Sequence, residues 1–251
     1  MISARWRLAR RRQRRALGAE SMARLPRLAL AGAAHLVALY GHSGQPVFVD
    51  DEDRRQFLAA LRESALQHQV AVHGYVLLAE HVHLLLTPAS AGALGALMQG
   101  LGRRYGAAFN RRHQRRGSLW AGRFRAAVVQ QGAAMAEALL FIESHAQRSG
   151  LVAAAADYPW SSARHHLGLA RDPLISESGS WWALGNTPFD REAAYRLLLD
   201  EGLSEPRATL LADACRKGWA WGDAAFLAEL AQQTARPLQP RRRGRPARPR
   251  D

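Results

Sequence analysis

The sequence predicts an α+β protein: a ferredoxin-like antiparallel sheet with helices on one face, followed by a small helical C-terminal extension. Strand-like apolar segments and segments of helical periodicity alternate in the order β-α-β-β-α-β-α up to about residue 150. The first six elements match the split βαβ arrangement. Beyond about residue 156 the patterns are helical and richer in tryptophan. A chain of 251 residues is long enough for one good core and a small second domain.

Four apolar segments predict the strands of the sheet. They cover residues 27–40, 70–78, 81–87 and 119–130. Pro88 ends the third strand, because proline has no amide hydrogen to donate to a neighbouring strand. Only two residues separate the second strand from the third, so a tight connection joins them.

The helices are predicted from apolar residues at helical spacing and from residues typical of helix ends. Four acids at residues 50–53 precede the first helix, because acids are favoured at the positive end of the helix dipole. Ser90 is expected to cap the second helix, which continues to about Arg112. The third covers residues 133–148, with Gly150 just past its end. Further helical patterns cover residues 189–200 and 204–232, and residues 219–222 lie between two of these helical pieces.

Composition restricts the compartment and the domain plan. Cys215 is the only cysteine, which fits a reducing compartment. The sequence has neither an apolar run long enough to span a membrane nor a clear signal peptide, so we expect a cytoplasmic protein without a membrane partner. The expected domains follow from these patterns: a disordered basic arm (1–21), a main domain (22–155), a helical extension (156–234) and a disordered basic tail (235–251).

The net charge of +14 is concentrated in three segments. Residues 1–15 contain seven arginines and no acid, and residues 241–251 contain six arginines and one acid. A third cluster of eight arginines has no acid between its members: Arg103, Arg104, Arg111, Arg112, Arg115, Arg116, Arg123 and Arg125. Such clusters favour contact with the phosphate backbone of a nucleic acid. The alternative is compositional bias, because Lys217 is the only lysine.

Two histidines stand at the start of the third predicted strand. His81 and His83 are two residues apart, so their side chains share one face of the strand while Val82 points to the other. Two imidazoles side by side on a strand can bind a divalent transition metal. The alternative is a pair of half-exposed strand histidines without a ligand.

Six collinear strings carry a resemblance to a known family. They cover residues 47–53, 80–85, 109–113, 117–124, 148–152 and 158–162. In order and spacing they resemble the REP-associated tyrosine transposases, a branch of the single-tyrosine HUH transposases. The resemblance implies the HUH transposase fold. It also implies a metal-dependent nuclease that nicks and rejoins single-stranded DNA near hairpins, with a tyrosine that forms a covalent phosphotyrosine.

The resemblance also implies roles for particular residues. In the family a helix reads Tyr-Ile-x-x-Asn-Pro-x-Arg-x-Gly, and here it begins at Phe141. Phe141 therefore occupies the nucleophile position, and a phenyl ring has no oxygen for the attack. The third ligand of a divalent ion, Mg²⁺ or Mn²⁺, would be His145 beside His81 and His83. A solvated helix histidine is the alternative for His145, and Glu143 is expected to be an exposed helix residue rather than a ligand or base.

Other residues are weaker candidates for the chemistry. Tyr75, Tyr105 and Tyr158 could each replace the missing tyrosine. In the tail, Arg243 and Arg245 belong to an Arg-Gly-Arg-Pro sequence that resembles an AT-hook, which places arginines in a narrow minor groove. A generic basic tail is the alternative.

The function expected first is that of a transposase-family protein that binds, nicks and joins hairpin-bearing single-stranded DNA. A catalytically inactive DNA-binding derivative is the second hypothesis, because of Phe141. An RNA-hairpin binder is the third, since basic patches do not by themselves distinguish RNA from DNA. The expected partner is DNA at the nucleoid, and the resemblance allows either a monomer or a homodimer.

Overall fold

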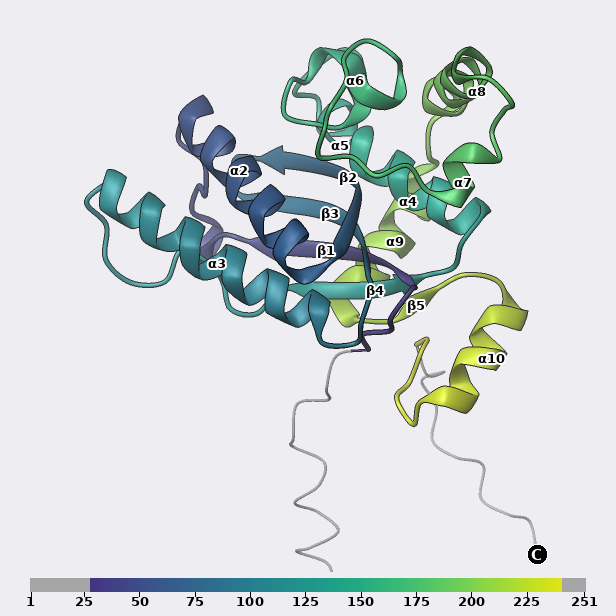
Figure 1. Cartoon of the computed structure of the whole chain (residues 1–251), viewed down its shortest axis with the longest axis horizontal. Coiled ribbons are helices and arrows are strands. Elements are labelled where there is room, and N and C mark those ends of the chain that lie inside the picture. The colour runs from purple at the N-terminus through teal and green to yellow at the C-terminus, as the bar shows by residue number, and fades with distance from the viewer. Residues whose placement is uncertain (1–27, 241–251) are drawn as a thin grey trace, which may run out of the picture.

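The computed structural model describes residues 28–240, and its centre is a sheet in the order β2-β3-β1-β4-β5 (Figure 1). The strands are β1 Ala34–Tyr40, β2 Val70–Leu78, β3 His81–Pro88, β4 Arg125–Val129 and β5 Ala220–Trp221. The first four pair antiparallel, and β5 adds to the edge parallel to β4. The α+β class and the ferredoxin-like strand order are therefore confirmed.

Helices cover both faces of this sheet. The longer helices are α2 Asp51–His68, α3 Ala93–Arg112, α4 Ala133–Glu143, α8 Pro188–Glu201, α9 Glu205–Lys217 and α10 Ala224–Gln233. The short ones are α5 His145–Arg148, α6 Ala163–His166 and α7 Gly179–Trp182. As expected, α2 and α3 share one face, while α4 and α9 add a second layer on the opposite face (Figure 1).

The alternation of side chains along β3 explains the two layers. Val82, Leu84 and Leu86 are fully buried in the core under α2 and α3. Leu85 is fully buried in the second core, under α4 and α9. Because the strand repeats every two residues, His83 points toward the second layer with Leu85. The layer that α4 builds is therefore the one that meets the histidines.

The first helix begins as its acids predict, and the second does not. The Asp50 side chain accepts a hydrogen bond from the amide of Asp53, which caps α2. In contrast, α3 begins at Ala93 after Gly92, without a side-chain cap. Ser90 is therefore not the cap; its carbonyl only accepts a turn hydrogen bond from the amide of Ala93.

The fourth strand is shorter than expected because the chain turns before it. The amide of Ala121 donates to the carbonyl of Tyr40, and Trp120 bridges to Gly41, so this segment pairs beyond the end of β1. Gly122, at φ 120°, then interrupts the pairing, and the regular strand begins only at Arg125. Similarly, the first strand begins at residue 34 rather than 27.

One helical prediction is also corrected. Ser144 separates α4 from α5, because its hydroxyl donates back to the carbonyl of Leu140 as the helix ends. The tryptophan segment 219–222, expected between two helical pieces, does lie between α9 and α10, where β5 pairs with β4. That strand depends on tertiary pairing, so helical periodicity alone does not reveal it.

The C-terminal part of the described chain joins the main core. Cys215 of α9 is fully buried, and its thiol donates to the carbonyl of Leu36 on β1. Leu238 lies in the segment assigned to the disordered tail, yet it is buried and its carbonyl accepts from the amide of Ala220. The expected arm (1–21) and the rest of the tail (241–251) lie outside the described residues. No helix among residues 28–240 is long and apolar enough to cross a bilayer.

Candidate functional site

The histidines on β3 lie where three strands meet side by side. His83 is 3% exposed and pairs across the sheet with Ala38 of β1 and Val76 of β2. His81 is half-buried and pairs with Tyr40, at the end of β1. Directly paired residues share a face, so Tyr40 and both histidines face the layer formed by α4 and α9.

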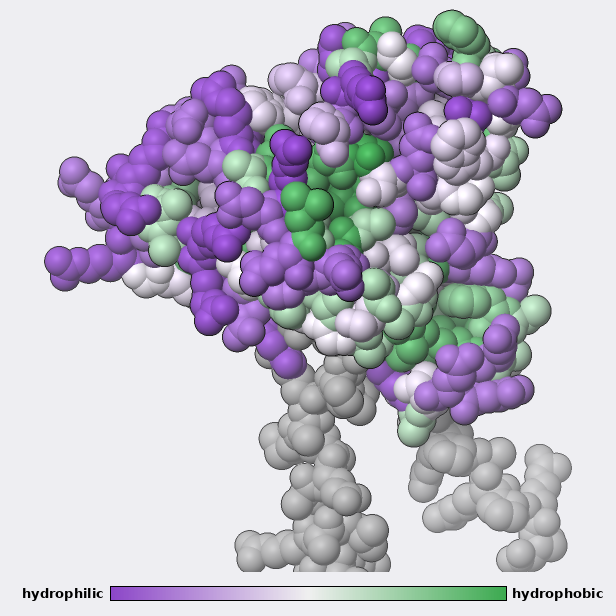
Figure 2. Space-filling view, in the orientation of Figure 1, coloured by the Kyte–Doolittle hydropathy of each residue, from purple (hydrophilic) through white to green (hydrophobic). Residues whose placement is uncertain are grey.

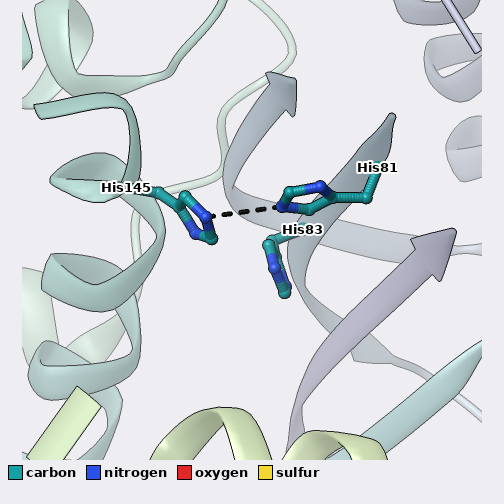
Figure 3. Close-up of side chains that lie close together, drawn as sticks. All are labelled: His81, His83 and His145. Carbon is teal, nitrogen blue, oxygen red and sulfur yellow. Dashed lines mark hydrogen bonds between the residues drawn. The ribbon is translucent and has the colours of Figure 1, made fainter. Parts of the chain in front are cut away.

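The third imidazole comes from the helical layer. His145 begins α5, and its Nε2 atom lies 3.4 Å from Nε2 of His81. The ring centre of His145 is 5.1 Å from that of His83. One nitrogen from each of the three residues can be chosen so that all lie within 4.8 Å of one another. Figure 3 shows the three rings converging on one space from the strand and the helix.

Burial keeps these imidazoles neutral. It lowers the pKa of His83 well below its ordinary value, with smaller contributions in the same direction from His145 and His81. Burial likewise lowers the pKa of His145 to about 3, aided by His81 and Arg148. Burial also lowers the pKa of His81, against a small opposing effect of Glu80. Neutral imidazoles offer the lone pairs that a metal needs.

The arrangement passes a simple test of fit for a metal ion. Nδ1 of His83 is buried and has no hydrogen-bond partner among the described residues. Ligand nitrogens bound about 2.1 Å from one ion lie roughly 3–3.4 Å apart. The 3.4 Å between Nε2 of His81 and Nε2 of His145 is close to this spacing. Three imidazoles could therefore hold one divalent cation here.

Phe141 lies beside the three histidines and is buried. Its ring centre is 5.3 Å from that of His83 and 5.8 Å from that of His145. The guanidinium of Arg148 lies 4.8 Å from the Phe141 ring centre and donates to the Phe141 carbonyl. The position implied for the nucleophile is thus inside the site, but it contributes only packing.

Glu143 has a different role from the expected one. It is fully buried rather than exposed on the helix. Its Oε1 atom accepts from the hydroxyl of Ser162 and interacts with Nδ1 of His166 at 2.7 Å. Its Oε2 atom accepts from the hydroxyl of Tyr195. The carboxylate therefore connects α4 to α6 and α8, and all of its partners come from segments distant in sequence.

The structure identifies a tyrosine that the sequence reasoning overlooked. The ring of Tyr40 stacks on that of His81, with centres 5.7 Å apart and planes 29° apart. It meets the ring of His83 edge-on at 6.4 Å. Burial raises the pKa of Tyr40 to about 12, and Cys215 adds to this while Arg216 and Arg125 oppose it. The split βαβ order places the first strand beside the histidine strand, so the expected strand order could have predicted that Tyr40 lies near the histidines.

The eight clustered arginines do not form one surface beside the histidines. Arg103, Arg104 and Arg111 project from α3, on the opposite face of the sheet. Figure 2 shows hydrophilic side chains gathered over α2 and α3. Arg125 alone of the cluster pairs with Ala38 and so shares the face of His83. Arg116 and Arg123 are exposed in the loop before β4, while Arg243 and Arg245 lie outside the described residues.

Arg112 makes structural contacts rather than presenting a free charge. Its guanidinium donates to both carboxylates at the start of α2, Asp50 and Asp53. Asp53 is fully buried; burial acts to raise its pKa, but hydrogen bonds, first from His113, outweigh this and hold it below its ordinary value. Arg112 therefore ties the end of α3 to the beginning of α2, which corrects its assignment as a DNA contact.

A pair of variants separates these two kinds of arginine. Arg112→Ala should lower the free energy of unfolding by about 1–3 kcal/mol, because a buried carboxylate loses a charged partner. Arg111→Ala, at an exposed position on the same turn, should leave stability unchanged and weaken DNA binding with a smaller salt dependence. Chemical denaturation and a salt titration of binding measure the two effects. Equal stability of the two variants would contradict the structural role of Arg112.

Comparison with known proteins agrees with this fold and motif order. Residues 33–145 match the family described as "Transposase IS200 like". Over these residues the chain is similar to that family. The family predicted from the sequence strings is thereby confirmed at this level, and it assigns the chain a transposase-type, DNA-binding function. The matched segment begins just before β1 and ends at His145, so it spans all three histidines.

No curated protein matches the chain, but several solved structures resemble it, and two of them are described here. One is a REP-associated tyrosine transposase bound to a REP hairpin, with 14% identity and a TM-score of 0.51. That match covers 63% of this chain and 93% of the other. The other is a candidate transposase from Deinococcus radiodurans R1, with 23% identity, a TM-score of 0.33, and coverage of 43% of this chain and 84% of that one. Only the likeness to the REP-associated transposase is used here, and at 14% identity it shows a similar fold and nothing more.

Proposed function

We propose that this IS200-like transposase binds hairpin-bearing single-stranded DNA and brings a phosphodiester to a divalent cation held by His81, His83 and His145. The observation that carries the proposal is the convergence of three neutral imidazoles from β3 and α5. A cation there would polarise the phosphate and offset the charge that develops during strand transfer. The hairpin substrate is suggested by the transposase of similar fold that was solved with a REP hairpin.

The donor set bears on the choice of metal. All three ligand atoms are imidazole nitrogens, and Mg²⁺ prefers oxygen ligands. Of the two ions expected, Mn²⁺ therefore fits better, with water and phosphate oxygens completing its coordination. Zn²⁺ is a competitor, because three imidazoles also suit it.

The position of the DNA follows from the charges near the histidines. Arg125 shares the sheet face with His83, and Arg148 lies against Phe141 on the other side of the site. These two arginines lie on opposite sides of the histidines, so we propose that single-stranded DNA crosses the site between them. Arg103, Arg104 and Arg111 of α3 would then contact duplex DNA on the far face. Such a protein would work at the nucleoid in the cytoplasm, as a monomer or homodimer.

A nicking assay tests this proposal. Incubation with a DNA hairpin carrying single-stranded tails and Mn²⁺ should give a cleaved strand, which chelation with EDTA should prevent.

The buried Phe141 favours a second function, because its side chain has no oxygen. In that case the protein is a derivative that binds DNA without cleaving it. Binding without cleavage, together with cleavage gained by Phe141→Tyr, would support that second function. Preference for an RNA hairpin of the same sequence in competition would contradict both.

A further inference from the structure

We propose that Tyr40, at the end of β1, supplies the nucleophile that Phe141 lacks. This inference rests on the function proposed above and names the residue that would carry the covalent step. The family position on α4 has no hydroxyl, yet a tyrosine ring lies against the same histidines on the neighbouring strand.

Tyr40 and Phe141 flank the histidine strand from opposite sides. In the sheet, β3 lies between β2 and β1; α4 packs on β2 and β3, while Tyr40 ends β1. The Phe141 ring centre is 5.3 Å from that of His83, and the Tyr40 ring centre is 6.4 Å from it. A phosphate at the three imidazoles would therefore be approached by two aromatic rings at similar range, of which only Tyr40 carries an oxygen.

The hydroxyl of Tyr40 is the one that remains available. All five tyrosines of the chain lie among the described residues, and four hydroxyls are engaged in hydrogen bonds. They donate as follows: Tyr75 to Asp172, Tyr105 to the carbonyl of Val47, Tyr158 to the carbonyl of Leu77, and Tyr195 to Glu143. Tyr40 is 38% exposed and has no hydrogen-bond partner within residues 28–240. The three substitutes expected from the sequence are thus held elsewhere by their own hydrogen bonds.

Two cations lie on the side of Tyr40 away from His145. Arg125 shares its sheet face, and Arg216, in the last turn of α9, interacts electrostatically with the phenol. Arg216 also pairs with Asp213, which holds the guanidinium on the helix. Positive charge on this side would attract the phosphate backbone and stabilise negative charge on the attacking oxygen.

The covalent step is a transesterification. The Oη atom of Tyr40 forms a bond to phosphorus, and the bond from phosphorus to one sugar oxygen breaks. The phenol proton ends on that leaving oxygen, so the products are a phosphotyrosine ester and a free sugar hydroxyl. Charge and atoms balance without any oxidant or further reactant. Rejoining is the reverse reaction, with a sugar hydroxyl of the second strand as the attacking group.

The test is to trap and map the adduct. The full-length protein is incubated with the tailed DNA hairpin and Mn²⁺, and the product is digested and sequenced by mass spectrometry. We expect the nucleotide on Tyr40, and a loss of adduct of at least about a hundredfold in Tyr40→Phe, which keeps the ring and removes only the oxygen. Tyr158→Phe, which removes a remote hydroxyl, should form the adduct normally.

Binding measurements separate this inference from the function on which it rests. Tyr40→Phe should bind Mn²⁺ and the hairpin within about twofold of the unmodified protein, because the imidazoles and arginines are untouched. An adduct on another residue, or cleavage without any adduct, would overturn the role of Tyr40 while leaving the proposed function intact. A loss of Mn²⁺ affinity in Tyr40→Phe would make the hydroxyl a ligand and would also overturn it. Absence of both Mn²⁺ and hairpin binding in the unmodified protein would instead reject the proposed function.

Discussion

Replacing His83 with alanine is expected to reduce Mn²⁺ affinity at least about a hundredfold. His83 is the most deeply buried of the three imidazoles, and its Nδ1 atom has no hydrogen-bond partner among the described residues. Mutation of a group that only hydrogen-bonds to a metal ligand already lowers metal affinity about 10–100-fold. Removal of a ligand itself should therefore lower the affinity at least about 100-fold. Isothermal titration calorimetry of the two proteins measures the difference directly.

Thermal unfolding gives a second readout of the same change. At a metal concentration about 100 times the Kd, binding stabilises the folded protein by about 2.7 kcal/mol. For a chain of this size that corresponds to a rise in Tm of roughly 5–10 °C. The rise should disappear in His83→Ala and persist in His68→Ala, which removes a half-buried histidine of α2 on the other face. If the two variants respond alike to Mn²⁺, the three-histidine site is wrong.

Glu143→Ala is expected to be the most destabilising single substitution that we propose, at about 3–5 kcal/mol. The carboxylate is fully buried and interacts with three groups, the side chains of Ser162, His166 and Tyr195. Each buried polar group left without a partner costs about 1–3 kcal/mol, and truncation leaves several in one cluster. Because these partners belong to α6, α8 and the segment before α6, the attachment of these elements to α4 should loosen.

Urea denaturation of three proteins measures this effect. Glu143→Gln keeps the shape and one carbonyl oxygen, so it should fall between the unmodified protein and Glu143→Ala. Glu229→Ala, at an exposed position of α10, should change the free energy of unfolding by less than about 0.5 kcal/mol. A loss below about 1 kcal/mol in Glu143→Ala would contradict the structural role and reopen the question of whether this carboxylate takes part in the chemistry.

Local patterns were sufficient for the sheet but not for all element ends. Apolar runs and the proline that closes β3 placed β2 and β3 correctly, because these strands are buried on both faces. The same reasoning extended the fourth strand too far, since Trp120 is apolar yet pairs with a turn rather than a strand. The expected cap at Ser90 failed for a related reason: residues that favour caps are common in ordinary turns as well.

The three histidines illustrate which site residues a sequence can reveal. His81 and His83 share a face through the two-residue period of a strand, which needs no tertiary information. His145 lies 62 residues after His83, so only the resemblance to a family connected them before the structure placed them together. Arg112 was misinterpreted because a cluster of charges does not reveal which members are bound by acids from another helix, here Asp50 and Asp53.

The order of strands and helices, the paired strand histidines and the IS200-like family were all readable from the amino acids, because each depends on near neighbours in the chain or on motif order. The register of β1 against β3 decided that Tyr40 stands beside His81, and the packing of α6 and α8 decided that Glu143 is buried. Both depend on contacts between segments about 20 to 50 residues apart in the sequence, whose free energy comes from burial and shared hydrogen bonds that no local pattern records.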